Sequence, residues 1–209
     1  MKFLIADDHA IVRKGLAQLL NEEFPTAEIR EVSNSTDALN EALKKDLDVI
    51  LLDISMPGRN GIETLKQLRS SGIKIPVLIL SMHPEDQYAI RVLKAGASGY
   101  LNKETATEEL STAVHKLLSG KKYISASVAE KLADLPGEGS EKAAHEFLSD
   151  REIQVLQLIA AGKTVSEIAN EIMLSVNTVS TYRTRVLEKL GLGNNGEITR
   201  YAFDNMLIV

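Results

Sequence analysis

Polar side chains follow the short apolar runs of this chain at the point where each run stops. Asp7 and Asp8 come after residues 3–6, Asp53 comes after residues 49–52, Ser81 comes after residues 77–80, and Lys103 comes shortly after Tyr100 and Leu101. Short apolar runs bounded by turn residues predict buried strands, and the longer stretches between them predict helices. This alternation predicts an α/β domain whose open parallel sheet carries helices on both faces.

The carboxyl ends of parallel strands meet at one edge of such a sheet, and ligands bind there. The sequence therefore predicts that three carboxylates, a hydroxyl and an ammonium group lie close together. Mg²⁺ prefers oxygen ligands and relieves the repulsion between carboxylates. A carboxylate can act as a nucleophile toward phosphorus, while a lysine and a hydroxyl contact phosphate oxygens. The pattern predicts a metal and phosphate site.

Each of these residues has a simpler interpretation when it is taken alone. An aspartate after a strand is most often the N-cap of the next helix, which is the favoured reading for Asp8 by itself. A lysine near a strand end is usually solvated. The occurrence of all these groups at four strand ends favours the site.

These residues resemble the receiver domain of two-component response regulators over about residues 1 to 120. The matching segments are LIADDH, VILLDISMPGRNG, VLILS and AGASGYLNK. The resemblance implies a five-stranded, flavodoxin-like parallel sheet. It also implies that Asp53 is the phosphoacceptor and that Asp7, Asp8, Asp53 and the backbone carbonyl of Ser55 hold Mg²⁺ or Mn²⁺. Its remaining implied roles are phosphoryl contacts for Ser81 and Lys103, a rotamer switch for Tyr100, the turn after the acceptor for Pro57 and Gly61, and an effect on phosphoryl lifetime for His83.

Composition predicts an intracellular protein. The chain has no cysteine, which excludes a disulfide framework and thiol chemistry. It has no apolar stretch long enough to cross a bilayer, and its beginning lacks the pattern of a signal peptide. We therefore expect a cytoplasmic location and no membrane partner.

The chain divides once. Proline, glycine, serine and charged residues alternate between Leu135 and Lys142, which is typical of a flexible linker. A short helix is possible over residues 125–135, where Val128 and Leu132 have helical spacing. The predicted organisation is a receiver over residues 1–120, a partly helical linker over 121–146, and a second domain over 147–209.

Helix signals repeat through the second domain and predict four helices. Ser149 with Glu152 and Thr164 with Glu167 have the spacing of capping boxes. We expect Gly162 to end the first helix, Ser175 to begin a long helix from Val176 to Leu190, and a last helix to run from Glu197 to Asp204. Two short helices and a tight turn before a longer one predict a helix-turn-helix domain.

The helix over residues 176–190 has a polar face suited to DNA. Small polar residues can reach base edges in the major groove, and flanking cations can bind phosphates. A solvated helix with routine charges is the competing interpretation, because residues 147–209 hold six basic and seven acidic side chains. The candidate DNA contacts are Asn177, Thr178, Ser180, Thr181, Arg183, Thr184, Arg185 and Lys189.

The second domain resembles the LuxR-type DNA-binding domain almost from end to end. The matching segments are LSDRE, VLQLIAAGKTVSEIA, LSVNTVSTYRTRVLEKL and the closing YA and LI pairs. Together with the receiver, they make the whole chain resemble a NarL/FixJ-type response regulator. Many relatives carry lysine at the position of Ser180 and histidine at that of Tyr182, so the preferred DNA sequence cannot be transferred.

The resemblance implies a phosphorylation-switched transcription regulator, not a conventional enzyme. A sensor histidine kinase or a small phosphodonor would phosphorylate Asp53. This would bias the surface near Pro84 and the last receiver helix, leading to release of the second domain, homodimerisation, or both. A homodimer would add two weak contacts on double-stranded promoter DNA.

Three other classes fit the sequence less well. A phosphatase or phosphotransferase with an aspartyl intermediate commonly has Asp-x-Asp at its nucleophile, whereas Ser55 stands two residues after Asp53 here. A small-molecule quorum sensor would have a ligand domain where this chain has the receiver motifs. An output domain that binds protein instead of DNA agrees with the acidic count and stays open.

Overall fold

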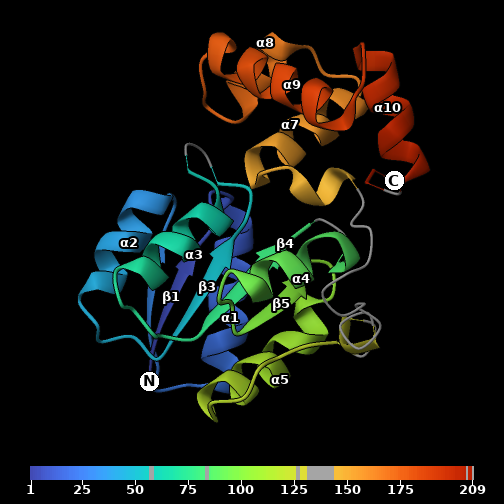
Figure 1. Ribbon diagram of the computed structural model, residues 1–209. Helices are drawn as coiled ribbons and strands as arrows, with labels where there is room; N and C mark the ends of the chain where they lie inside the picture. The colour runs from blue at the N-terminus through green and yellow to red at the C-terminus, as the bar shows by residue number, and fades with distance from the viewer. Residues whose placement is uncertain (57–58, 83–84, 126–127, 131–143, 206, 209) are drawn as a thin grey trace. The chain divides into compact units, whose positions relative to one another are not determined.

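The protein is seen here as a computed structural model that describes residues 1–56, 59–82, 85–125, 128–130, 144–205 and 207–208 (Figure 1). Its compact units are Met1–Leu135 and Pro136–Val209. The domain borders predicted at residues 120 and 146 stay predictions. Residues 128–130 are helical, but the rest of the helix suggested up to Leu135, like the linker up to Lys142, lies outside the described residues.

The first unit is built around a five-stranded parallel sheet in the order β2-β1-β3-β4-β5. The strands are β1 Lys2–Ala6, β2 Glu28–Val32, β3 Val49–Asp53, β4 Val77–Ser81 and β5 Gly99–Asn102. Every residue of β3 and β4 is buried, as expected for central strands covered on both faces. The predicted fold class is confirmed. The edge strand β2 has the sequence EIREV, which contains no continuous apolar run. This agrees with the partial exposure of the strand.

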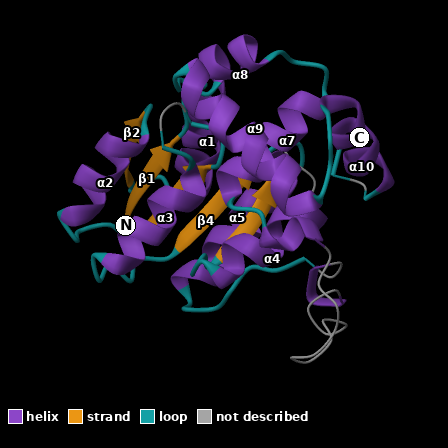
Figure 2. Ribbon diagram, turned by 45° about the horizontal axis from the view of Figure 1, so that its top comes forward, coloured by secondary structure: helices purple, strands orange, loops and turns teal. Residues whose placement is uncertain are grey.

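Helices cover both faces of this sheet (Figures 1 and 2). They are α1 Ala10–Glu23, α2 Ser35–Leu43, α3 Gly61–Ser70, α4 Glu85–Lys94 and α5 Ala106–Leu118. Side chains that alternate along the strands, such as Phe3, Ile5 and Leu51, form one core cluster with Leu16 and Leu110 from α1 and α5. The strand order reverses between β1 and β3, so the carboxyl ends of these two strands flank the switch point where such sheets bind ligands.

Tyr123 extends the sheet beyond its last strand. It forms a parallel bridge with Gly99, and its N–H donates to the Ser98 carbonyl at 2.9 Å. Its phenol donates to Glu109 Oε2 on α5 at 2.7 Å. A Cβ on Gly99 would lie 2.8 Å from the Tyr123 carbonyl oxygen, so only glycine allows this close approach.

The second unit is helical. It contains a short 3-10 turn, η1 Ala144–Phe147, followed by α7 Asp150–Ala160, α8 Val165–Glu171, α9 Val176–Leu190 and α10 Asn195–Asp204. Both predicted capping boxes form, with Ser149 and Thr164 as N-caps. The predicted bounds of α9 are confirmed, since Ser175 caps its start and Gly191 ends it in a left-handed conformation. The last helix begins two residues before Glu197 because Asn194 is its N-cap.

Membrane-spanning helices are absent from the part of the chain that the structure describes, since none of its helices combines the required length with sufficient hydropathy.

Candidate functional site

The predicted acidic pocket forms at the carboxyl ends of β1, β3 and β5. The Lys103 ammonium lies 2.6 Å from Asp7 Oδ2 and 3.0 Å from Asp53 Oδ1. The side chains of Asp7 and Asp53 are almost completely buried, whereas Asp8 is one-quarter exposed at the pocket edge. Strand ends that are far apart in the sequence thus bring three carboxylates and one ammonium together.

Burial and charge shift the protonation of the central pair. Burial raises the pKa of Asp53 above its usual value, and the neighbouring Asp7 adds to this, although Lys103 acts in the opposite direction. Burial lowers the pKa of Lys103, but the carboxylates of Asp53 and Asp7 outweigh it and raise the pKa overall. Lys103 therefore carries its positive charge at neutral pH. A further cation beside Asp53 would stabilise the charged form of this buried carboxyl group.

Ser81 and Tyr100 lie on the two neighbouring strands. Ser81 ends β4 and is fully buried, and its carbonyl accepts the N–H of Lys103 at 2.9 Å, which ties the ends of β4 and β5 together. Tyr100 is 1% exposed on β5, so its ring occupies an inward position in this structure. Ser55 is exposed in the turn that follows Asp53. Pro57 and His83 lie outside the described residues.

Gly61 holds the turn after Asp53 close to the backbone of β3. Its N–H donates to the Ile54 carbonyl at 2.9 Å, and a Cβ here would lie 2.1 Å from the Asp53 carbonyl oxygen. No side chain fits at that distance. The glycine allows α3 to begin directly beside the proposed acceptor, with Asn60 and Glu63 forming a capping box.

The donor set fits a hard divalent cation. One ligand atom each from Asp7, Asp8, His9 and Asp53 can be chosen so that all lie within 4.8 Å of one another. Within the described part of the chain, neither carboxylate oxygen of Asp53 accepts a hydrogen bond of good geometry, although both are buried. Buried carboxylate oxygens without such partners are a suitable environment for an ion that prefers oxygen.

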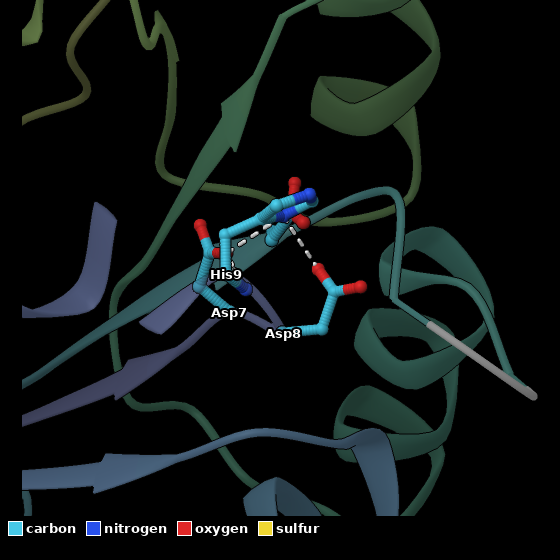
Figure 3. A group of neighbouring side chains, drawn as sticks. Asp7, Asp8 and His9 are labelled. Carbon is cyan, nitrogen blue, oxygen red and sulfur yellow. Dashed lines mark hydrogen bonds and ion pairs between the residues drawn. The ribbon is translucent and has the colours of Figure 1, made fainter. Parts of the chain in front are cut away.

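Two residues near this pocket were missed by the sequence analysis. His9 directly follows the acidic pair, and its Nδ1 lies 2.9 Å from Asp8 Oδ1 (Figure 3). Arg13, one helical turn further on, donates from Nη1 to the Asp7 carbonyl at 2.6 Å and lies 3.6 Å from Glu31. Their spacing after Asp8 could have indicated that they lie near the pocket, because α1 begins at residue 10 and its first turn holds both residues close to the end of β1.

The polar face of α9 is exposed, as predicted. Asn177, Ser180, Thr181 and Thr184 are exposed, and Thr178 is half-buried, whereas Val179 and Val186 are buried on the opposite side. The hydroxyls of Thr181 and Thr184 donate to the carbonyls of Asn177 and Ser180 at 2.9 and 3.1 Å. Their oxygens keep acceptor capacity on the exposed face.

The three cations of α9 have different surroundings. Lys189 Nζ lies 2.7 Å from Glu152 Oε2 on α7, and the side chain of Glu152 is 3% exposed. Arg183 Nε donates to Asn195 Oδ1 on α10 at 2.5 Å. Arg185 is exposed and makes no ion pair with any residue that the structure describes. Of the three expected phosphate contacts, Arg185 is thus the most available.

Comparison with protein families identifies both units. Residues 3–115 match the response regulator receiver domain, and residues 146–202 match the bacterial regulatory proteins of the luxR family. The chain is 34% identical to the response regulator UvrY of Escherichia coli K12, covering 95% of this chain and 92% of that protein. It is 32% identical to the oxygen regulatory protein NreC of Staphylococcus aureus, covering 100% and 99%.

Solved structures give the same result. RcsB of Salmonella enterica serovar Typhimurium, bound to the rprA promoter in the presence of the phosphomimetic BeF3⁻, is 30% identical with a TM-score of 0.63, covering 96% of this chain and 98% of that one. The heme-sensing system's response regulator ChrA is 31% identical with a TM-score of 0.51, covering 99% and 98%.

Proposed function

This chain belongs to the response regulators that join a receiver domain to a LuxR-type DNA-binding domain, and we propose that Asp53 is its phosphoacceptor. The observation that carries the proposal is the pairing of buried Asp53 with Lys103 at 3.0 Å beside Asp7. A sensor histidine kinase or a small phosphodonor would supply the phosphoryl group. One Asp53 carboxylate oxygen would attack phosphorus, and the bond from phosphorus to the donor would break.

Asp7, Asp8, Asp53 and the Ser55 carbonyl would hold Mg²⁺ or Mn²⁺ in this pocket. The ion would supply positive charge that offsets the transferring phosphoryl oxygens. Lys103 would hold another phosphoryl oxygen as a point charge, and the Ser81 hydroxyl would donate to a third. Asp53 would attack in its carboxylate form, so these roles need no general base.

Phosphorylation would then bias a two-state surface. The new charge would recruit the Ser81 hydroxyl and the Lys103 ammonium, which already faces Asp53, to the phosphoryl oxygens. It would favour the inward rotamer of Tyr100 over the outward one, and this would change the surface near α4 and α5. The consequence would be release of the second unit, homodimerisation, or both. A dimer would present two copies of α9 to two half-sites in promoter DNA, and the protein would act in the cytoplasm.

The DNA contacts would divide by chemistry. Asn177, Thr178, Ser180, Thr181 and Thr184 would meet base edges and neighbouring backbone, while Arg183, Arg185 and Lys189 would meet phosphates. The exposure of Thr181 and Thr184 supports the proposed contacts with base edges. The ion pair of Lys189 with Glu152 makes Lys189 the weakest candidate of the second group.

Labelling with acetyl phosphate in Mg²⁺ tests the acceptor. Asp53→Asn should abolish incorporation, because an amide is not a competent nucleophile. Asp37→Asn, which changes an exposed aspartate in the first turn of α2, is the matched control and should label like the wild type. Undiminished incorporation in Asp53→Asn would place the acceptor at another residue.

A further inference from the structure

His9 adds a nitrogen donor to the edge of the acidic pocket (Figure 3). Its Nδ1 lies 2.9 Å from Asp8 Oδ1 and 3.4 Å from Asp7 Oδ1. Because donor atoms of His9 and the three aspartates all fit within 4.8 Å of one another, one ion could reach them after small side-chain movements. The buried Asp53 carboxylate, which accepts no hydrogen bond of good geometry from the described residues, forms the inner wall of the same space.

The backbone restricts where this imidazole can lie. His9 is the N-cap of α1, and its N–H donates to Asp7 Oδ1 at 2.8 Å. Its carbonyl accepts the N–H of Arg13 at 3.1 Å. The side chain itself is 64% exposed, so an ion arriving from solvent meets His9 at the pocket entrance.

The chemistry of the donors determines which ions benefit from this arrangement. Carboxylates and carbonyls suit Mg²⁺, Ca²⁺ and Mn²⁺, whereas imidazole suits Zn²⁺, Ni²⁺ and other borderline ions. A pocket with oxygen donors alone favours hard ions by ligand type. Replacing one oxygen or water ligand by an imidazole nitrogen shifts that preference toward the later transition metals.

We propose that His9 Nδ1 is a ligand for a borderline divalent metal ion, such as Co²⁺, Ni²⁺ or Zn²⁺, held together with the carboxylates of the acidic pocket. This inference rests on the proposed receiver site, since it concerns the ion that the same aspartates hold. His9 thereby determines metal specificity. In the alternative, the His9 imidazole pairs with Asp8 and binds no metal ion. Removing the imidazole would then have no effect that differs between metal ions.

Calorimetric titration of the full chain with Co²⁺ alone and with Mg²⁺ alone, at pH 8.0, tests the specificity. His9→Gln should weaken Co²⁺ binding by about tenfold or more, because the loss of even a residue that only supports a metal ligand costs about 10–100-fold in affinity. Mg²⁺ affinity should change by less than about twofold. The control His115→Gln removes an exposed histidine on α5 that pairs with Glu23 at 2.8 Å, and it should change neither affinity. Equal factors for both ions, or no change for either, would overturn the proposal.

Proton NMR of the Co²⁺ complex gives a readout that does not depend on affinity. A coordinated imidazole gives strongly shifted signals from its non-exchangeable ring protons, which should be present in the wild type and in His115→Gln and missing in His9→Gln. His83→Gln extends the comparison to the histidine that follows Ser81 and Met82 in the sequence. Loss of the signal in His83→Gln but not in His9→Gln would overturn the assignment.

Phosphorylation in Mg²⁺ separates this proposal from the proposed function. If the wild type takes up phosphoryl at Asp53 but His9→Gln has no effect on Co²⁺ binding, the ligand assignment is wrong and the receiver chemistry stands. If Asp53→Asn labels like the wild type but the Co²⁺ effect is found, the acceptor assignment is wrong and His9 is a ligand nonetheless.

Discussion

Asp7 and Asp8 are neighbours in the sequence but have different surroundings. Asp7 is fully buried, pairs with Lys103 and accepts the His9 N–H, whereas Asp8 is partly exposed and pairs with His9. Removing Asp7 leaves the His9 N–H without its acceptor and takes one of two carboxylates away from the buried Lys103 ammonium. Removing Asp8 mainly relieves repulsion from the other carboxylates.

We therefore expect the two alanine variants to differ in stability. Asp7→Ala should lower the free energy of unfolding by about 1–3 kcal/mol, and Asp8→Ala should leave it unchanged or raise it slightly. Both variants should weaken Mg²⁺ binding. Urea unfolding and Mg²⁺ titration of the same preparations measure the two effects. Unchanged Mg²⁺ affinity in both variants would exclude these residues as the metal site.

Among the helices, α9 is joined to α7 by a partly buried ion pair. Burial raises the pKa of Glu152, but the hydrogen bonds from Lys189 and Ser149 together outweigh it and lower the pKa below its usual value of 4.5. A carboxyl group whose pKa is lower in the folded than in the unfolded protein stabilises the folded protein at pH values above 4.5. This stabilisation is lost as the pH falls through the folded-state pKa.

Glu152→Gln should remove this pH-dependent contribution. At pH 7 we expect the free energy of unfolding of the second unit to fall by about 1–2 kcal/mol. This is less than for a fully buried ion pair, because the Lys189 side chain is 41% exposed. Below pH 4.5 the difference from the wild type should shrink. Urea titrations followed by NMR signals of α7 and α9 measure it, with the exposed Glu188→Gln as control. A difference that is independent of pH would contradict this account.

The DNA contacts of α9 can be separated by salt dependence. Thr181→Ala should cost about 1–3 kcal/mol on a duplex selected from a random library and little on a scrambled duplex. Arg185→Ala should weaken binding to both duplexes and lower the salt slope by about one unit. Fluorescence anisotropy over a salt series measures both. If neither variant changes either affinity, α9 does not read DNA, and an output domain that binds protein is favoured.

Local signals explain which elements could be predicted from the sequence. The bounds of α9 follow from Ser175 and Gly191, which lie directly at its ends, and the pocket follows from polar residues at strand ends. The partner of Lys189 could not be predicted, because Glu152 lies 37 residues away and the packing of α7 against α9 brings them together. The Arg183–Asn195 bond depends on packing in the same way. The roles assigned to the pocket residues and DNA contacts stay predictions.

At the scale of the whole molecule, charge limits how the protein can bind DNA. The chain carries a formal net charge of −5, and two of the three cations on α9 are engaged with neighbouring helices. Non-specific affinity, which depends on phosphate contacts, should therefore be low. We therefore expect tight binding to require two copies of α9 acting together.

A duplex with one half-site should reveal this requirement. After treatment with acetyl phosphate, the full chain should bind a two-half-site duplex about 100-fold or more tightly than a duplex of equal length with one half-site scrambled. The Asp53→Asn chain should show a much smaller ratio. Fluorescence anisotropy measures the affinities, and equal affinity for both duplexes would show that one copy is sufficient.

Tyr123 shields part of the outermost strand of the receiver, so a fragment that stops at residue 120 would leave the backbone of β5 open to pairing with another chain. Unpaired strand edges promote aggregation. A fragment of residues 1–120 should therefore self-associate, whereas residues 1–125 should stay monomeric in sedimentation velocity. Gly99→Ala in the longer fragment should restore self-association, because its methyl group displaces Tyr123. Identical sedimentation of all three would mean that the segment after α5 serves only as a tether.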